Sequence, residues 1–334
     1  MDARKGLERQ APPCTRSCHF AHLAANGTLP FGLQIQLSAG IIVFEASEDA
    51  KLTVAVSLIN MKGGVGKTTL AFNLAWHSAW LANLRVLAVD LDPQANLSQY
   101  FMGAEKYLDY LNKDKGTVVD VFEQFSAPKS AKGAPTLIDP AKVIHKLHAW
   151  DDGSRLDLIP SRLELAWTLK NPTEKAHLLP QFLAKVSLEY DLILIDCAPT
   201  ESILTAAAYR SSRFVAVPVK PEFLATIGLP LLARSLEEFR LMHQDQTLEM
   251  AGIIFNDMRR SNTPPEQIKS KSDVEKLAGT FGWPVFKNTA YHSDSYPAGS
   301  RQGKPIFLTD YARDYVKGDF ALVAQQFLKV VGAK

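Results

Sequence analysis

Cysteine, net charge and long apolar runs are all scarce in this sequence of 334 residues. Three cysteines are too few for a disulfide-stabilised scaffold, and they suit a reducing compartment. The formal net charge is only +2, so the charge of the whole chain does not require a polyanionic partner. No uninterrupted apolar run reaches the roughly 18–20 residues that a membrane-spanning helix needs. The sequence therefore excludes a disulfide framework and a membrane-spanning helix.

What is present is typical of a folded globular protein. Hydrophobic residues make up 46% of the chain and charged residues 22%. This content can fill a large core, which excludes disorder over most of the chain. The length suits one large α/β domain or two small ones.

Residues 1–50 differ in pattern from the rest and predict an irregular N-terminal appendage. Asp2, Glu8 and the pair Pro12-Pro13 interrupt its basic residues, so we do not expect a signal peptide. Only Ile41–Phe44 has the apolar, β-branched composition of a short strand.

One cluster in this appendage combines residue types that bind zinc, namely Cys14, Cys18, His19 and His22. Structural zinc sites usually draw on two separated pairs of ligands. No second pair stands at a typical spacing here, which favours an incidental cluster over a metal site.

Residues 51–334 alternate between apolar strand patterns and helical patterns, which predicts a single α/β domain. We expect strands at 52–60, 84–90, 155–160, 191–196, 213–218 and 249–256. We expect helices at 67–80, 174–188, 202–210, 228–243, 265–280 and 309–331. Such alternation favours a mostly parallel twisted sheet with helices on both faces, and ligands bind beyond the carboxyl ends of its strands.

Residues 102–150 fit this rhythm poorly, and we expect them to form a helical insertion. His145 and His148 are three residues apart and could suggest a metal pair. Without a nearby carboxylate or cysteine partner, they are better explained as residues of a surface helix.

The strongest motif is a glycine-rich loop that follows the first of these strands and opens a helix. It reads Lys62-Gly63-Gly64-Val65-Gly66-Lys67-Thr68-Thr69. The three glycines let the backbone point several N–H groups at phosphate oxygens, and the helix adds its positive N-terminal end. Lys67 is placed to reach the β- and γ-phosphates, and Thr68 to ligate Mg²⁺. The sequence therefore predicts a P-loop that binds MgATP.

Lys62, at the start of the loop, is an additional lysine that an ordinary P-loop does not require. With it the sequence resembles the deviant-Walker ATPases of the ParA/MinD family. The resemblance implies a sandwich homodimer with ATP at the interface, in which Lys62 reaches the partner subunit's nucleotide. A cation delivered there would stabilise charge on the transferred phosphoryl group, as an arginine finger does. The catalytic residues would then be Lys62, Lys67 and Asp92, whose motif is described next.

Two acidic motifs extend this resemblance. Val89-Asp90-Leu91-Asp92-Pro93-Gln94 is similar to the Walker A′ region of ParA proteins. The resemblance implies that Asp92 orients the attacking water and that Asp90 supports the Mg²⁺ shell. Asp196 follows the four apolar residues 192–195 and would hold Mg²⁺ through water, as a Walker B aspartate. The residues that follow, Thr200-Glu201, depart from the family pattern.

The resemblance covers roughly residues 52–331 and suggests further contacts with the nucleotide. By analogy Asn256 and Tyr291 flank the adenine, and Glu222 lies near the dimer interface. These positions rest on the resemblance alone.

The other branches of the family fit less well. The C-terminal segment lacks the basic amphipathic character of a membrane-binding helix, and the core has only Cys197, whereas an iron–sulfur cluster needs four thiolates. A membrane-cycling regulator and a nucleotide-dependent scaffold that hardly hydrolyses ATP remain as alternatives.

The C-terminal part carries the basic excess that non-specific DNA binding would need. Residues 251–334 contain 12 lysines and arginines against 8 acidic residues. The candidates for phosphate contacts are Arg259, Arg260, Arg301 and Lys304. In place of the basic stretch of small ParA proteins, however, residues 291–295 read Tyr-His-Ser-Asp-Ser.

Together these features predict a ParA-type ATPase that positions or partitions a cargo. It would bind ATP and Mg²⁺, dimerise, bind DNA and be released when a ParB-like or other activator stimulates hydrolysis. It would not bind membranes, would hydrolyse ATP slowly without a partner, and would lie in the cytoplasm on the nucleoid when ATP-bound.

Overall fold

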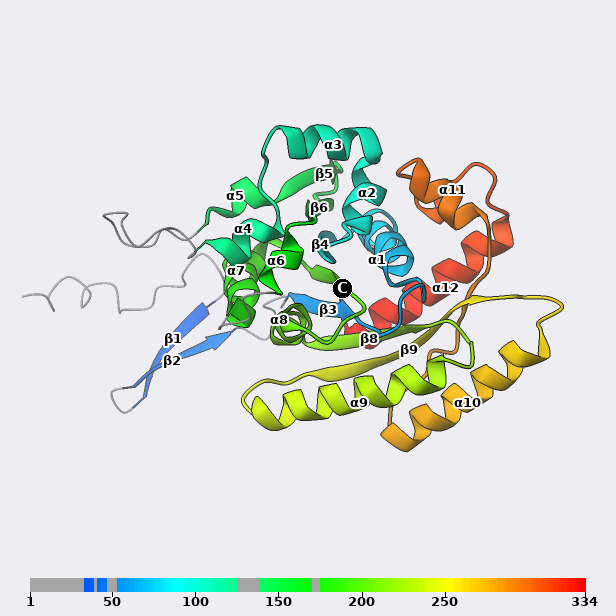
Figure 1. Cartoon of the computed structure of the whole chain (residues 1–334). Coiled ribbons are helices and arrows are strands. Elements are labelled where there is room, and N and C mark those ends of the chain that lie inside the picture. Colours follow the sequence, from blue (N-terminus) through cyan, green and yellow to red (C-terminus); the bar gives the residue numbers. More distant parts are fainter. Residues whose placement is uncertain (1–32, 39–40, 47–52, 125–137, 170–174) are drawn as a thin grey trace, which may run out of the picture. The chain divides into compact units, whose positions relative to one another are not determined.

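The computed structural model describes residues 33–38, 41–46, 53–124, 138–169 and 175–334 (Figure 1). The chain divides into two compact units, residues 1–52 and residues 53–334. In the first unit, strands β1 (Leu33–Ser38) and β2 (Ile41–Ala46) pair antiparallel, with Leu33 opposite Ala46. Only one short strand was expected there. The cluster Cys14, Cys18, His19 and His22 lies outside the described residues.

The second unit is built on an eight-stranded sheet with the strand order β10-β9-β8-β3-β7-β4-β6-β5. Its strands are β3 (Val54–Leu58), β4 (Arg85–Leu91), β5 (His145–Ala149), β6 (Arg155–Ile159), β7 (Leu192–Cys197), β8 (Phe214–Val219), β9 (Glu249–Met258) and β10 (Ala290–Tyr291). Every neighbouring pair is parallel except β5 and β6. Strand β3 lies between β7 and β8, so the loop after it emerges among several strand ends.

Helices cover both faces of this sheet (Figure 1). They are α1 (Lys67–Trp76), α2 (Asn96–Met102), α3 (Ala104–Asn112), α4 (Val118–Glu123), α5 (Pro140–Val143), α6 (Leu165–Thr168), α7 (Leu178–Val186), α8 (Ile203–Ser211), α9 (Ala225–Met242), α10 (Pro265–Phe281), α11 (Ser295–Arg301) and α12 (Asp314–Val331). Successive side chains of a strand point to opposite faces. Accordingly, Leu192 and Leu194 pack in the core with α1 and α12, and Ile193 and Ile195 in the core with α7, α8 and α9.

The predicted α/β class is correct, and the differences are local. Residues 145–149 form edge strand β5, so His145 and His148 lie on a strand and not on the expected surface helix. Only the preceding part of the segment 102–150 is helical among its described residues. Strand β10 was not predicted, because two residues are too short to show a period.

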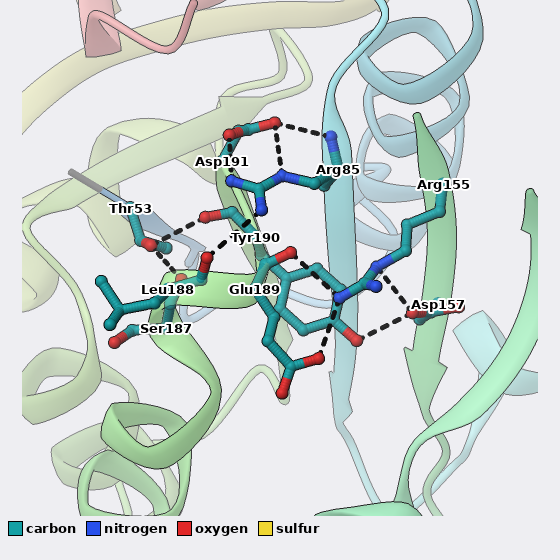
Figure 2. Close-up of polar contacts among 9 residues, drawn as sticks. All are labelled: Thr53, Arg85, Arg155, Asp157, Ser187, Leu188, Glu189, Tyr190 and Asp191. Carbon is teal, nitrogen blue, oxygen red and sulfur yellow. Dashed lines mark hydrogen bonds and ion pairs between the residues drawn. The ribbon is translucent and has the colours of Figure 1, made fainter. Parts of the chain in front are cut away.

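The amino ends of the central strands are joined by a cluster of ion pairs (Figure 2). The Arg85 guanidinium and backbone N–H both bind Asp191, with Nη2 2.8 Å from Oδ1. Arg155 lies 4.6 Å from the centre of the Tyr190 ring, and the Tyr190 hydroxyl donates to Asp157 over 2.8 Å. Because Asp157 and Asp191 are buried, these contacts compensate charges that would otherwise be costly. They fix the strands at the edge opposite the glycine-rich loop.

Candidate functional site

The glycine-rich loop connects β3 to α1 at the carboxyl edge of the sheet. Gly64 and Gly66 have φ angles of +73° and +88°, a region that favours glycine. A Cβ atom on Gly66 would also collide with Nδ2 of Asn256, so the Asn256 amide would have to move to admit a side chain there. Helix α1 begins at Lys67 without a side-chain cap, which leaves its first N–H groups available to an anion.

Lys67 is buried in this loop and faces both backbone oxygens and acidic side chains. Its Nζ donates to the carbonyl oxygens of Asn60 and Lys62, each over 3.1 Å. Burial lowers the pKa of Lys67, and the charge of Asp196 opposes that shift most strongly. The Lys67 ammonium group is therefore bonded to two neutral carbonyl oxygens near the charge of Asp196. Charged phosphate oxygens would be stronger acceptors, so Lys67 can exchange the carbonyl oxygens for them.

Asp196 is the penultimate residue of β7 and is completely buried. Neither of its carboxylate oxygens has a hydrogen bond of good geometry among the described residues, although the Thr68 hydroxyl lies close enough to lower its pKa. Burial and the neighbouring Asp90 raise that pKa well above its usual value. An unpartnered buried carboxylate is costly, and a cation beside it would remove the cost.

Asp90 lies on the adjacent strand β4 and is held by specific donors. The backbone N–H and the hydroxyl of Ser98 donate to its Oδ2 over 2.8 Å and 2.6 Å. Burial nevertheless raises the pKa of Asp90 to about 7. Ser98 also accepts a bond of 2.9 Å from the N–H of Ser161, so it joins the ends of β4 and β6. Ser98 was not among the predicted residues, although a hydroxyl in the first turn of the helix after an acidic motif was an available signal.

Asp92 follows β4 in the loop that leads to α2. Its Oδ1 accepts the N–H of Gln94 over 2.9 Å, which fixes the carboxylate, and the residue is largely buried. Its charge is one of those that act on Lys67 and on Asp196. The structure thus brings Lys67, Thr68, Asp90, Asp92 and Asp196 together at one edge of the sheet.

These residues fit a magnesium ion that arrives with phosphate groups. No group of three or more His, Cys, Asp or Glu side chains in the described part of the chain is arranged to hold a metal by itself. Mg²⁺ usually keeps several waters and binds through one or two protein oxygens plus substrate phosphates. The Thr68 hydroxyl and the unpartnered oxygens of Asp196 would supply the protein's part.

Of the two residues expected beside the adenine, Asn256 contacts the glycine-rich loop and Tyr291 lies on strand β10. Asn256 ends the buried part of β9, and its Nδ2 donates to the carbonyl of Val65 over 3.0 Å, so it contacts the loop directly. Tyr291 lies on β10, paired with Met258 of β9. Its ring is close to Arg260, whose guanidinium lies 5.7 Å from the ring centre.

The four DNA-binding candidates are not equivalent. Arg260 pairs with Asp319 at 2.5 Å, and Lys304 with Asp310 at 3.0 Å, so the charges of both are compensated within the chain. Arg259 and Arg301 are exposed, and their guanidinium groups have no ion-pair partner in the parts of the chain that the structure covers. These two arginines are therefore the ones most available to phosphates.

Lys62 has a partner that the sequence does not reveal. Its Nζ lies 2.5 Å from Oε2 of Glu222, in the segment between β8 and α9. Glu222 was expected only to lie near an interface. The contact shows that the loop and this segment are neighbours within one chain.

The described helices include none with the length and apolarity to cross a membrane. Residues 53–250 match the AAA domain family. The chain is 30% identical over 271 residues to the chromosome-partitioning ATPase Soj of Treponema pallidum, which covers 80% of this chain and 96% of that protein.

Two solved structures share the fold. Apo McdA of Cyanothece superposes with a TM-score of 0.67 at 19% identity, covering 82% of this chain and 99% of McdA. A plasmid partition protein of Borrelia burgdorferi bound to AMPPNP has a TM-score of 0.63 at 22% identity, covering 83% and 99%.

Proposed function

The chain belongs to the AAA domain family and, within it, to the ParA/Soj partition ATPases, and on that premise we propose that it is an ATP-driven positioning switch. It binds MgATP, forms a sandwich homodimer, binds DNA without sequence preference, and is released when a ParB-like or other activator stimulates hydrolysis. The observation that carries this proposal is the buried carboxylate of Asp196, which lies near Lys67 of the glycine-rich loop and has no hydrogen bond of good geometry among the described residues. The AMPPNP bound to the Borrelia relative supports a nucleotide as the ligand.

Binding in this proposal begins with the loop and Lys67. The backbone N–H groups of residues 63–68 surround the phosphates, with the N-terminus of α1 behind them. Lys67 exchanges its two carbonyl acceptors for β- and γ-phosphate oxygens, which bind an ammonium more strongly because they are charged. Burial then makes this ion pair stronger than one in water.

The acidic residues divide the remaining tasks. Bound Mg²⁺ would supply positive charge that offsets the phosphates, with Thr68 and Asp196 as its holders and Asp90 in its outer shell. Asp92 orients the attacking water from a carboxylate already fixed by the N–H of Gln94. Lys62, delivered by the partner subunit, stabilises charge on the transferred phosphoryl group. Slow turnover of the isolated chain follows if that delivery limits the reaction.

Phosphate release from ATP by the full chain, with and without Mg²⁺, tests this proposal. We expect Mg²⁺-dependent release that Lys67→Ala abolishes, since phosphate binding depends on that ammonium group. Lys113→Ala, which removes an exposed lysine that pairs with Asp109, should match wild type. Equal release by the Lys67→Ala variant would contradict the assigned site.

A further inference from the structure

Lys62 and Glu222 form an ion pair that links the start of the glycine-rich loop to the segment before α9. Their side chains are 22% and 40% exposed, so the pair is shielded but not buried. Asn60 places the two partners: its Nδ2 donates to the carbonyl of Pro218 over 2.8 Å, and its Oδ1 accepts the N–H of Lys62 over 2.9 Å. The backbone near both residues is thus tied together, and the ion pair is part of a built contact.

Glu222 keeps a second partner on its other oxygen. Lys220 Nζ lies 3.0 Å from Oε1 of Glu222 and 2.8 Å from Oδ2 of Asp257. Asp257 in turn lies 2.6 Å from Nδ1 of His292. The hydrogen bond from Lys62, followed by that from Lys220, lowers the pKa of Glu222, so its carboxylate is charged at neutral pH. If Lys62 leaves, Glu222 therefore remains paired, which keeps the cost of opening small.

We propose that Glu222 is a positioning residue that holds Lys62 inside its own subunit until a nucleotide-bound partner takes it over. This inference rests on the proposed function, in which Lys62 acts on the partner's nucleotide. While Nζ contacts Glu222, it cannot contact a second subunit's phosphates. Dimerisation must therefore break the Lys62–Glu222 pair, and phosphate charge on the partner replaces the carboxylate.

The size of the effect follows from the exposure of the pair and from symmetry. Ion pairs of this exposure change an equilibrium by about 1.4- to 5-fold. A symmetric dimer uses the same residue from both subunits, so two such pairs open for each dimer formed. If both pairs are already absent before association, the dimer should be tighter by roughly 2- to 25-fold. Added salt should reduce the difference, because it screens the pair that wild type must break.

Glu222→Gln in the full chain tests this inference by sedimentation equilibrium with AMPPNP and Mg²⁺. The expected result is a lower dimer dissociation constant than wild type, with unchanged AMPPNP affinity of the dilute monomer. Glu249→Gln is the matched control, because Glu249 is 44% exposed, pairs with Arg213 at 3.2 Å and lies at the amino end of β9. An unchanged or weakened dimer in Glu222→Gln, relative to this control, overturns the inference.

The same substitution in a Lys62→Ala background separates the inference from the proposed function. If Glu222 acts through Lys62, Glu222→Gln has no further effect there, whereas an equal gain in both backgrounds overturns the inference. If Lys62→Ala dimerises as well as wild type, the trans role of Lys62 is wrong. Failure of wild type and Glu222→Gln alike to dimerise contradicts the proposed dimer, and the inference falls with it.

Discussion

Asp90 and Asp196 occupy partner positions on the adjacent parallel strands β4 and β7, so two buried carboxyl groups lie side by side. Only Asp90 is satisfied, by Ser98. Asp196 interacts with the charges of Asp90 and Lys67 and has no good hydrogen bond of its own among the described residues. This arrangement disfavours the empty site and favours one that holds a cation with phosphate.

Asp196→Asn should therefore stabilise the nucleotide-free chain and weaken its binding of MgATP. Removing a buried charge next to Asp90 should raise the free energy of unfolding of the nucleotide-free chain by about 1 kcal/mol. Loss of the carboxylate that would hold Mg²⁺ through water should weaken MgATP binding on the order of tenfold or more. Thermal melts and calorimetric titrations with MgATP measure both, with Asp109→Asn on the exposed surface as control. MgATP affinity equal to wild type would show that Asp196 does not serve the metal.

The sequence was sufficient for the α/β class and for placing the glycine-rich loop and the acidic residues after strands, because strand ends and loop glycines are local signals. It was not sufficient for contacts that depend on strand order. Glu222 meets Lys62 only because β8 lies beside β3, and Ser98 meets Ser161 only because β6 lies beside β4. The pairing of Arg260 with Asp319 likewise crosses from the loop after β9 to α12, which composition cannot show.

The burial of His77 should make the folded chain less stable in mild acid. Burial lowers its pKa, its ring is packed near Phe307, and its Nδ1 has no hydrogen-bond partner among the described residues. Below about pH 6.5 the unfolded chain binds a proton that the folded chain resists. Stability is therefore lost as pH falls from 6.5 through the lower, folded pKa.

Thermal melts between pH 7.5 and pH 5.5 check this expectation. Burial also lowers the pKa of His145 and of His148, and it raises the pKa of Asp90 to about 7, which adds stability as pH falls. His77→Gln should therefore lose less stability than wild type over this range without becoming independent of pH. His177→Gln, in a short surface turn, is the control. The same pH dependence in wild type and His77→Gln would show that His77 does not contribute.

Lys62→Ala should separate nucleotide binding from the steps that need a second subunit. Lys67, the loop N–H groups and Asp196 are unchanged in this variant, so ATP affinity should stay within about twofold of wild type. ATP-dependent dimerisation or hydrolysis should be lost, because the cation for the partner's phosphates is missing. Fluorescent-nucleotide titration and phosphate release measure the two separately. Hydrolysis at the wild-type rate would refute the interface role.

DNA binding should depend on the two arginines that lack ion-pair partners among the described residues. Arg259→Glu with Arg301→Glu should weaken ATP-dependent binding to all sequences alike and lower the salt slope by about one for each DNA phosphate that is no longer neutralised. Arg260→Glu should also destabilise the fold, because Asp319 loses its partner. Filter-binding titrations over a salt series measure the effect, with exposed Lys185→Glu as control. Absence of ATP-dependent DNA retention by wild type would exclude DNA as the surface on which the protein is positioned.

The most direct test of the proposed ATP-dependent switch between monomer and dimer uses the Asp92→Ala variant. Its molar mass in solution with ATP and Mg²⁺ is measured by size-exclusion chromatography with light scattering. Removing the carboxylate that orients water should leave phosphate binding intact and stop hydrolysis, so the ATP-bound state should accumulate. We predict a stable dimer of Asp92→Ala with ATP and a monomer without it, whereas wild type returns to monomer as ATP is consumed. Asp92→Ala that remains monomeric with saturating ATP, under conditions in which wild type dimerises, would contradict the switch.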